Sequence, residues 1–98
     1  MKVELSRRAE REMQRIARWW QEHASSAAVF LDELEQMIEH IETTSMLGAV
    51  YEAKARRTVH RRLMKKSGCH VYLVCQSAQL VVIVSIWGAR RRRGPKFR

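Results

Sequence analysis

The chain has 98 residues, of which 46% are hydrophobic and 30% charged, a balance that favours a folded domain over intrinsic disorder. The longest strongly apolar run covers only Leu80–Trp87, far short of the roughly 20 residues that a membrane-spanning helix needs. The first residues reach Arg7 without the apolar core of a secretory signal. We therefore expect one domain over residues 1–98 that works in the cytoplasm and does not contact a membrane.

The formal net charge is +9, and the two parts of the chain share it very unequally. Residues 1–52 hold all ten Asp and Glu side chains and six Lys or Arg, which gives −4. Residues 53–98 hold thirteen Lys or Arg and no acid, which gives +13. Because the second part cannot neutralise itself, we expect an anionic partner, either a nucleic acid or an acidic protein segment.

The first half of the sequence predicts a short strand and two helices. Lys2–Leu5 alternates like an edge strand, and Ser6 can cap the helix that follows. The spacing of apolar residues predicts one helix over Arg7–Glu22 and a second from about Ala27 to Thr43. A tight turn with a serine N-cap joins them, so we expect an antiparallel helical hairpin.

The two predicted helices carry opposite charges beside their apolar stripes. The apolar stripe of the first helix comprises Ala9, Met13, Ile16, Ala17 and Trp20, and its opposite face carries Arg7, Arg8, Arg11, Arg15 and Arg18. The apolar stripe of the second comprises Phe30, Leu31, Leu34, Met37, Ile38 and Ile41, flanked by Asp32, Glu35, Glu39 and Glu42. We expect the arginine face to be solvated and partly neutralised by ion pairs with the second helix.

After Gly48 the apolar period changes from helical to alternating. The pattern predicts strands at Tyr51–Ala55, Val59–Lys65, Cys69–Gln76 and Leu80–Trp87. The last of these is apolar on both faces and is expected inside the sheet. The order of elements predicts an α+β fold with the helical hairpin packed on one face of a small, mainly antiparallel sheet. Residues 88–98 form a basic tail, in which Arg90–Arg93 are expected to be ordered and Lys96–Arg98 mobile.

The two cysteines are not expected to pair. Cys69 and Cys75 lie near the ends of one predicted strand, roughly 20 Å apart. A disulfide needs Cα atoms within about 7 Å, so both are expected to be small buried residues in a reducing compartment. No Cys or His spacing suits zinc, and we expect neither a metal nor a cofactor.

The residues alone leave catalysis open as one hypothesis. No motif typical of nucleophilic catalysis is present. Lys, Arg and His can nevertheless hold a scissile phosphate and stabilise its charge, as a metal-free ribonuclease requires. The candidates for such a site are His60, Arg62, Lys65 and Lys66, with Arg90 approaching across the sheet. The competing interpretation is a solvated basic edge or a groove for an acidic partner.

Several short stretches together match the features of one known superfamily. They are Leu5-Ser6 with Ala9-Glu10, Arg61-Arg62-Leu63, His70-Val71-Tyr72, and the ending Ile86-Trp87-Gly88-Ala89-Arg90 with Gly94-Pro95. With the helical hairpin, these stretches resemble the RelE/ParE superfamily of type II toxin–antitoxin toxins over residues 3–95. The ending is the most specific part of the resemblance. The chain departs from ParE-like sequences at Arg7 and at Met46-Leu47, where those sequences often carry proline.

Within the superfamily the chain resembles ParE more closely than RelE. RelE-type toxins are ribosome-dependent mRNA endonucleases that typically place a catalytic Tyr or His near the C-terminus, and this chain has neither after Trp87. ParE-type toxins have a similar fold but bind DNA gyrase and trap its cleaved-DNA complex. The resemblance therefore implies a growth-inhibiting, plasmid-stabilising toxin with no catalytic residue and no small-molecule substrate. A RelE-like endonuclease using the five candidates above is the alternative.

The resemblance also implies partners and the surfaces that meet them. A cognate antitoxin would lay an acidic segment over the helical hairpin and the sheet edge. The toxin would form a homodimer or, with the antitoxin, a heterotetramer. The expected antitoxin-binding residues are Trp20, Arg57, Arg61 and Arg62. The expected gyrase-binding residues are Trp87, Arg90, Arg91, Arg92 and Arg93. Their guanidinium forks suit gyrase carboxylates or the phosphates of gyrase-bound DNA.

Overall fold

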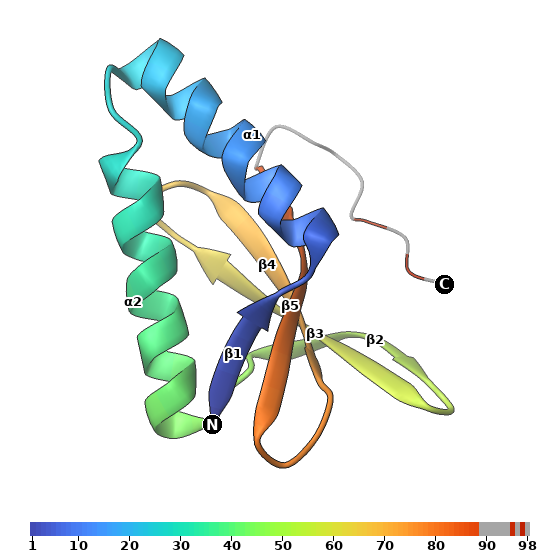
Figure 1. The fold of residues 1–98 in the computed structure, drawn as a ribbon. Coiled ribbons are helices and arrows are strands. Elements are labelled where there is room, and N and C mark those ends of the chain that lie inside the picture. The colour runs from blue at the N-terminus through green and yellow to red at the C-terminus, as the bar shows by residue number, and fades with distance from the viewer. Residues whose placement is uncertain (89–94, 96, 98) are drawn as a thin grey trace.

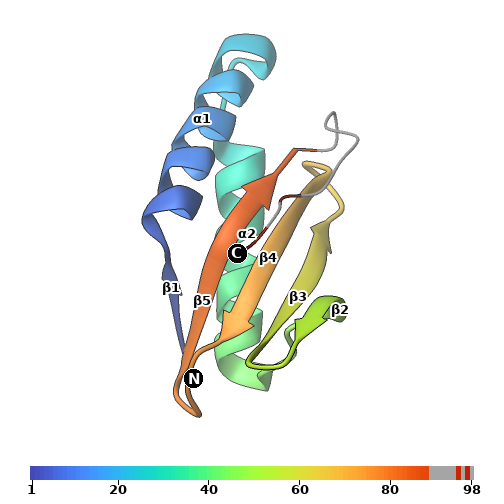
Figure 2. The ribbon, with the colours of Figure 1, turned by 90° about the vertical axis from the view of Figure 1, so that its right-hand side faces the viewer.

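The structure, a computed structural model, describes residues 1–88, 95 and 97 (Figures 1 and 2). In chain order its elements are β1 (Lys2–Leu5), α1 (Arg7–Ala24), α2 (Ala28–Thr44), β2 (Ala49–Lys54), β3 (Arg57–Met64), β4 (Cys69–Cys75) and β5 (Leu80–Trp87). The predicted α+β class and the predicted order of elements are confirmed. Residues 89–94, 96 and 98, most of the predicted basic tail, lie outside the described residues.

The five strands form one sheet in the order β1-β5-β4-β3-β2. Neighbouring strands are antiparallel except β1 and β5, which run parallel with Lys2 opposite Leu80 and Leu5 opposite Ile83. β5 therefore lies inside the sheet, which confirms the prediction from its two apolar faces. β1 is an edge strand, also as predicted, although its partner comes from the other end of the sequence.

Both helices lie on one side of the sheet, here called the helix face (Figures 1 and 2). α1 begins at Ser6, whose hydroxyl accepts a hydrogen bond from the Ala9 amide at 3.1 Å. The helices meet at a turn where Ser25 adopts a left-handed conformation with φ of 59°. From this turn they spread apart, so the predicted helical hairpin is open toward the sheet (Figure 1).

The hydrophobic core fills the space between the helices and the three central strands. α2 contributes four buried side chains, whereas Ala9 is the one fully buried residue of α1. The rest of the apolar stripe of α1 is partly buried against this core. The core residues are Ala9, Phe30, Leu34, Met37, Ile41, Met64, Cys69, Val71, Leu73, Val81, Ile83 and Ile86.

Three expectations about the helices are wrong. Leu31 is 39% exposed, because it lies about 100° around α2 from Phe30, beyond the arc that meets the sheet. The N-cap of α2 is Ala27 and not a serine, although the Ser26 hydroxyl accepts from the Ala28 amide. No ion pair joins α1 to α2, two helices that the structure describes in full. The acidic side chains of α2 thus form no ion pair with the arginines of α1.

The two cysteines are free and lie at opposite ends of β4. Cys69 is buried as predicted, but Cys75 is exposed because β4 extends past the core at that end. Burial raises the pKa of the Cys69 thiol, which keeps it protonated and unreactive at neutral pH. Neither described helix is apolar over a length that could cross a bilayer.

Candidate functional site on the open face of the sheet

Three aromatic rings gather on the face of the sheet that the helices leave uncovered, here called the open face. Tyr72 lies in β4 between the core residues Val71 and Leu73, so its side chain points to the open face. Tyr51 is the extra residue at a bulge in β2, and its ring meets that of Tyr72 edge-on with centroids 4.7 Å apart. Phe97 completes this aromatic cluster, 5.8 Å from Tyr72 and 6.4 Å from Tyr51.

Hydrogen bonds from two side chains of β2 also hold the backbone near Phe97. The Tyr51 hydroxyl donates to the carbonyl oxygen of Pro95 at 3.2 Å, and Lys54 Nζ donates to the carbonyl oxygen of Phe97 at 3.3 Å. Pro95 is buried. Phe97 lies within the segment expected to be mobile, and both its ring and its carbonyl oxygen have partners on the sheet.

Three arginines surround the aromatic cluster and form what is here called the basic rim. Arg8 of α1 and Arg57 of β3 lie 5.2 and 5.8 Å from the centroid of the Phe97 ring. Arg61 of β3 lies 5.4 Å from the centroid of Tyr51. Such cation–π contacts contribute about 0.5–1 kcal/mol each when they are exposed. The open face thus presents aromatic surface framed by positive charge, which suits an anionic or acidic partner.

Two titratable groups of the open face, Tyr72 and His70, are neutral at pH 7 and do not offset the charge of the arginines. Burial raises the pKa of the Tyr72 phenol, a nearby Tyr51 adds to this, and a hydrogen bond from Arg61 opposes it. Burial and the charge of Arg61 together lower the pKa of His70. At neutral pH neither group carries charge. Among the described residues, no three His, Cys, Asp or Glu side chains come together to hold a metal.

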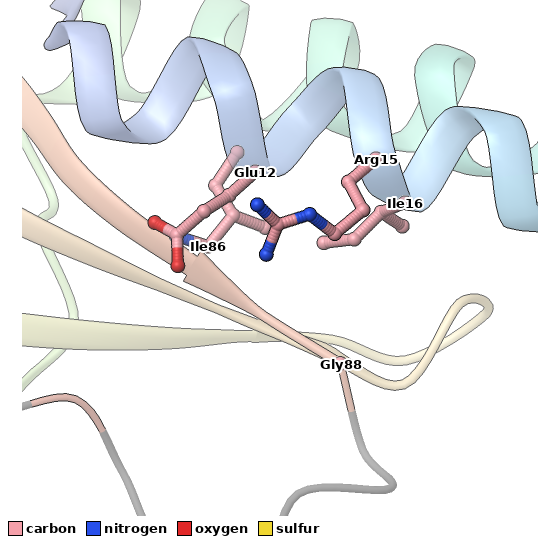
Figure 3. A pocket seen from close by; sticks show the side chains of 5 residues that line it. All are labelled: Glu12, Arg15, Ile16, Ile86 and Gly88. Atoms are coloured by element: carbon pink, nitrogen blue, oxygen red, sulfur yellow. The ribbon is translucent and has the colours of Figure 1, made fainter.

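A second feature lies where α1 crosses the end of β5 (Figure 3). Glu12 Oε1 accepts hydrogen bonds from Ser85 Oγ at 2.8 Å and from the Ile86 amide at 3.2 Å, and Arg8 Nε lies 3.6 Å away. Arg15 and Gly88 help to line a recess of about 30 Å³ beside this carboxylate. The recess has room for a water molecule and not for a substrate. Glu12 therefore fixes the end of β5 to α1.

Of the residues proposed for a ribonuclease, His60 and Arg62 contact the same loop, whereas Lys65 and Lys66 lie in the turn after β3. His60 Nδ1 bonds the carbonyl oxygen of Gly48 at 3.1 Å. Arg62 Nη1 lies 3.0 Å from both the Met46 carbonyl oxygen and His40 Nδ1, so it holds the loop between α2 and β2. Lys65 and Lys66 follow β3 in a turn that the carboxylate of Glu33 holds through the amides of Lys66 and Ser67. The fifth candidate, Arg90, lies outside the described residues.

The residues proposed to bind the antitoxin lie on both sides of the sheet. Arg57 and Arg61 belong to the basic rim on the open face. Arg62 lies on the helix face, and Trp20 packs against the core from α1 with its ring edge-on to Trp19. A single extended segment would have to pass around a sheet edge to contact all four. Of the residues proposed to bind gyrase, only Trp87 is described, half-buried at the end of β5.

Sequence reasoning missed the aromatic cluster and the part that Arg8 plays in its rim. The alternation of β3 and β4 does place Arg61 and Tyr72 on one face, and the structure pairs them directly. No sequence pattern could place Phe97, because it lies beyond the last strand between basic residues. No sequence pattern indicates the bulge in β2 at which Tyr51 meets Tyr72.

Comparison with known proteins identifies the family. The family described as the ParE toxin of the type II toxin–antitoxin system parDE matches residues 3–93. No curated protein matches the chain. The match spans both helices and all five strands, including Trp87 and the start of the arginine run. The fold, the basic second half and this match agree, and the chain belongs to the ParE family of type II toxins.

Proposed function

We propose that this toxin acts by binding DNA gyrase and trapping its cleaved-DNA complex, and that a cognate antitoxin neutralises it. The observation that carries the proposal is the match to the ParE family over residues 3–93. That match does not favour an endonuclease of the RelE type. The sequence agrees with this choice, since no Tyr or His follows Trp87.

The contacts of the basic residues support binding over RNA cleavage. Arg62 and His60 hold the loop before β2 through the carbonyl oxygens of Met46 and Gly48. Gly48 has φ of +92°, and an added Cβ would come within 2.5 Å of Arg62 Cγ, so loop and arginine are fitted to each other. These contacts give Arg62 a structural role that needs no RNA.

We assign gyrase contact to Trp87 and to Arg90–Arg93, which follow it after Gly88 and Ala89 in the sequence. Arginine suits this role because it is permanently charged and can bond carboxylates or phosphates with two parallel hydrogen bonds. We assign the acidic segment of the antitoxin to the basic rim at Arg57 and Arg61, with Trp20 and Arg62 as the residues it would reach on the helix face.

Purified gyrase tests this proposal directly. The toxin should inhibit supercoiling and accumulate cleaved DNA, and the product of the neighbouring open reading frame should reverse both effects. Replacing Arg90, Arg91, Arg92 and Arg93 with alanine should abolish inhibition and leave the free energy of unfolding nearly unchanged. A variant with Lys2→Ala and Arg56→Ala, two exposed cations outside the assigned surfaces, serves as control and should inhibit normally.

Adding the protein to translating ribosomes tests the endonuclease alternative. Site-specific mRNA cleavage that disappears with Arg62→Ala or Lys65→Ala would replace the gyrase proposal with the endonuclease alternative. Full gyrase inhibition by the quadruple alanine variant would contradict the assignment of the arginine run only.

A further inference from the structure

The outward face of α1 carries a line of arginines that none of the roles above uses. Arg7, Arg11 and Arg18 are all exposed and are here called the arginine stripe. Steps of four and seven residues place them within an arc of about 40° around the helix, and they extend over about 17 Å along its axis. They therefore form one straight row of positive charge.

The stripe has no internal partner among the described residues. The ion pairs there join Lys2 to Glu4, Arg8 to Glu12, and Lys54 to Glu52. None of them involves Arg7, Arg11 or Arg18, and no described group hydrogen-bonds their side chains. Glu10 and Glu22 lie on the same helix, three residues after Arg7 and four residues after Arg18, but neither forms an ion pair with the row.

Helix stability does not account for these residues. The first turn of a helix favours acidic side chains, because the backbone amides there carry partial positive charge. α1 instead begins with Arg7 and Arg8, and Glu10 is the one acid of its first turn. Neutral helix formers such as glutamine would serve the fold at least as well as arginine does.

The chemistry of the surrounding surface distinguishes between kinds of anionic partner. A protein interface usually has an apolar or aromatic centre within a polar rim. The large hydrophobic side chains exposed in the described part of the molecule are absent from α1; they are Met1, Val29, Leu31, Met46, Val50 and Leu63. A charged row without an apolar centre fits a regular polyanion better than an acidic protein.

We propose that the arginine stripe of α1 binds the phosphate backbone of duplex DNA. Duplex DNA carries its charges at regular spacing along a stiff rod, and each guanidinium can bond a phosphate with two hydrogen bonds. Proteins that bind single strands add aromatic side chains on which bases stack, and the stripe has none. This interaction goes beyond the proposed function because it requires no gyrase.

The salt dependence of DNA binding tests the inference. Affinity of the full chain for a short fluorescently labelled duplex of mixed sequence is measured by anisotropy between about 50 and 200 mM salt. Each phosphate contact contributes about 0.9 to the slope of log affinity against log salt, so R11Q/R18Q should reduce the slope by about 2. At the lowest salt, affinity should fall at least about tenfold, because two phosphate contacts are lost.

A matched variant separates the stripe from net charge. K2Q/R56Q removes the same charge from exposed positions on β1 and the turn after β2, and its slope should stay within about 0.5 of the parent value. Unfolding curves of both variants confirm that the fold is intact. Equal loss of slope in the two variants, or no loss in R11Q/R18Q, would overturn the proposal.

Two competitors identify the kind of partner. Unlabelled duplex should displace the probe better than polyglutamate or single-stranded RNA at equal charge. Polyglutamate competing as strongly as duplex would assign the stripe to an acidic protein, and a preference for single-stranded RNA would also contradict the proposal. None of these measurements contains gyrase. A failure of DNA binding would therefore not contradict gyrase inhibition, and a failure of gyrase inhibition would not contradict DNA binding by the stripe.

Discussion

The two faces of the sheet are built from different chemistry. On the helix face the core consists of apolar side chains, among them Phe30, and it contains no charged residue. The open face carries the aromatic cluster of Tyr51, Tyr72 and Phe97, and arginines contact its rings directly. Aliphatic packing provides most of the stability of a domain, whereas aromatic and guanidinium groups are those that interfaces favour. The comparison teaches that one sheet separates an aliphatic core from a surface whose aromatic and guanidinium groups suit contact with a partner.

Truncating the helix face should give the largest loss of stability. Ile83 is fully buried in β5, and Ile83→Ala should lower the free energy of unfolding by about 3 kcal/mol, since it removes buried methyl groups and leaves a cavity. Urea unfolding measures this loss. Val50→Ala is the control, because Val50 is 59% exposed at the sheet edge and should change stability by under about 0.5 kcal/mol. Similar losses in both variants would mean that the core does not lie where the structure places it.

Removing the ring of Phe97 should have a smaller effect. Phe97→Ala loses ring contacts with two tyrosines and two arginines, but its site is half-buried, so we expect a loss of about 1–2 kcal/mol. Tyrosine fluorescence should change in the folded state, because Tyr51 and Tyr72 gain solvent. Leu63→Ala, on the same face but 52% exposed, should alter neither quantity. An unchanged tyrosine signal in Phe97→Ala would contradict the aromatic cluster.

The smallest expected change in stability concerns the hydrogen bonds between Glu33 of α2 and the turn after β3, and it depends on pH. Partial burial alone raises the pKa of Glu33, but bonds from the Ser67 hydroxyl and the amides of Lys66 and Ser67, with the charge of Lys66, hold it below 4.5. Because the pKa of Glu33 is lower in the folded protein than in the unfolded chain, its ionised form stabilises the fold at pH values above the ordinary pKa of the group. This stabilisation is lost as the pH falls through the pKa of the folded state. Glu33→Gln should therefore cost about 1 kcal/mol at neutral pH, because the largely solvated carboxylate makes only modest bonds.

The measurement for Glu33 is unfolding in urea at neutral pH and again well below pH 4.5. The difference between Glu33→Gln and the parent should shrink as the medium becomes acidic. Glu35→Gln provides the comparison, since Glu35 is exposed on the same helix. A difference that grows on acidification would have the wrong sign for this carboxylate.

The sequence predicted the fold far better than the site. Local periodicity is enough for the elements, and the two apolar faces of Leu80–Trp87 were enough to put that strand inside the sheet. The aromatic cluster could not be predicted from the sequence, because its residues are about 20 to 45 positions apart. A bulge and a segment without periodicity bring them together. The ion pairs expected between the helices failed for a similar reason. Stripe positions define a helix face, but the angle between two helices decides which faces meet.

The pairing of β1 with β5 has a consequence for how the toxin is made. The first strand to be synthesised has its partner at residues 80–83, so β1 must wait until nearly all of the sheet exists. A product of early termination that lacks β5 leaves β1 unpaired and the core under α1 open to water. Contacts between positions so far apart in the sequence slow folding, because a long loop must close before they form. We therefore expect chains that end before the last strand not to fold, so a truncated message should yield no folded toxin.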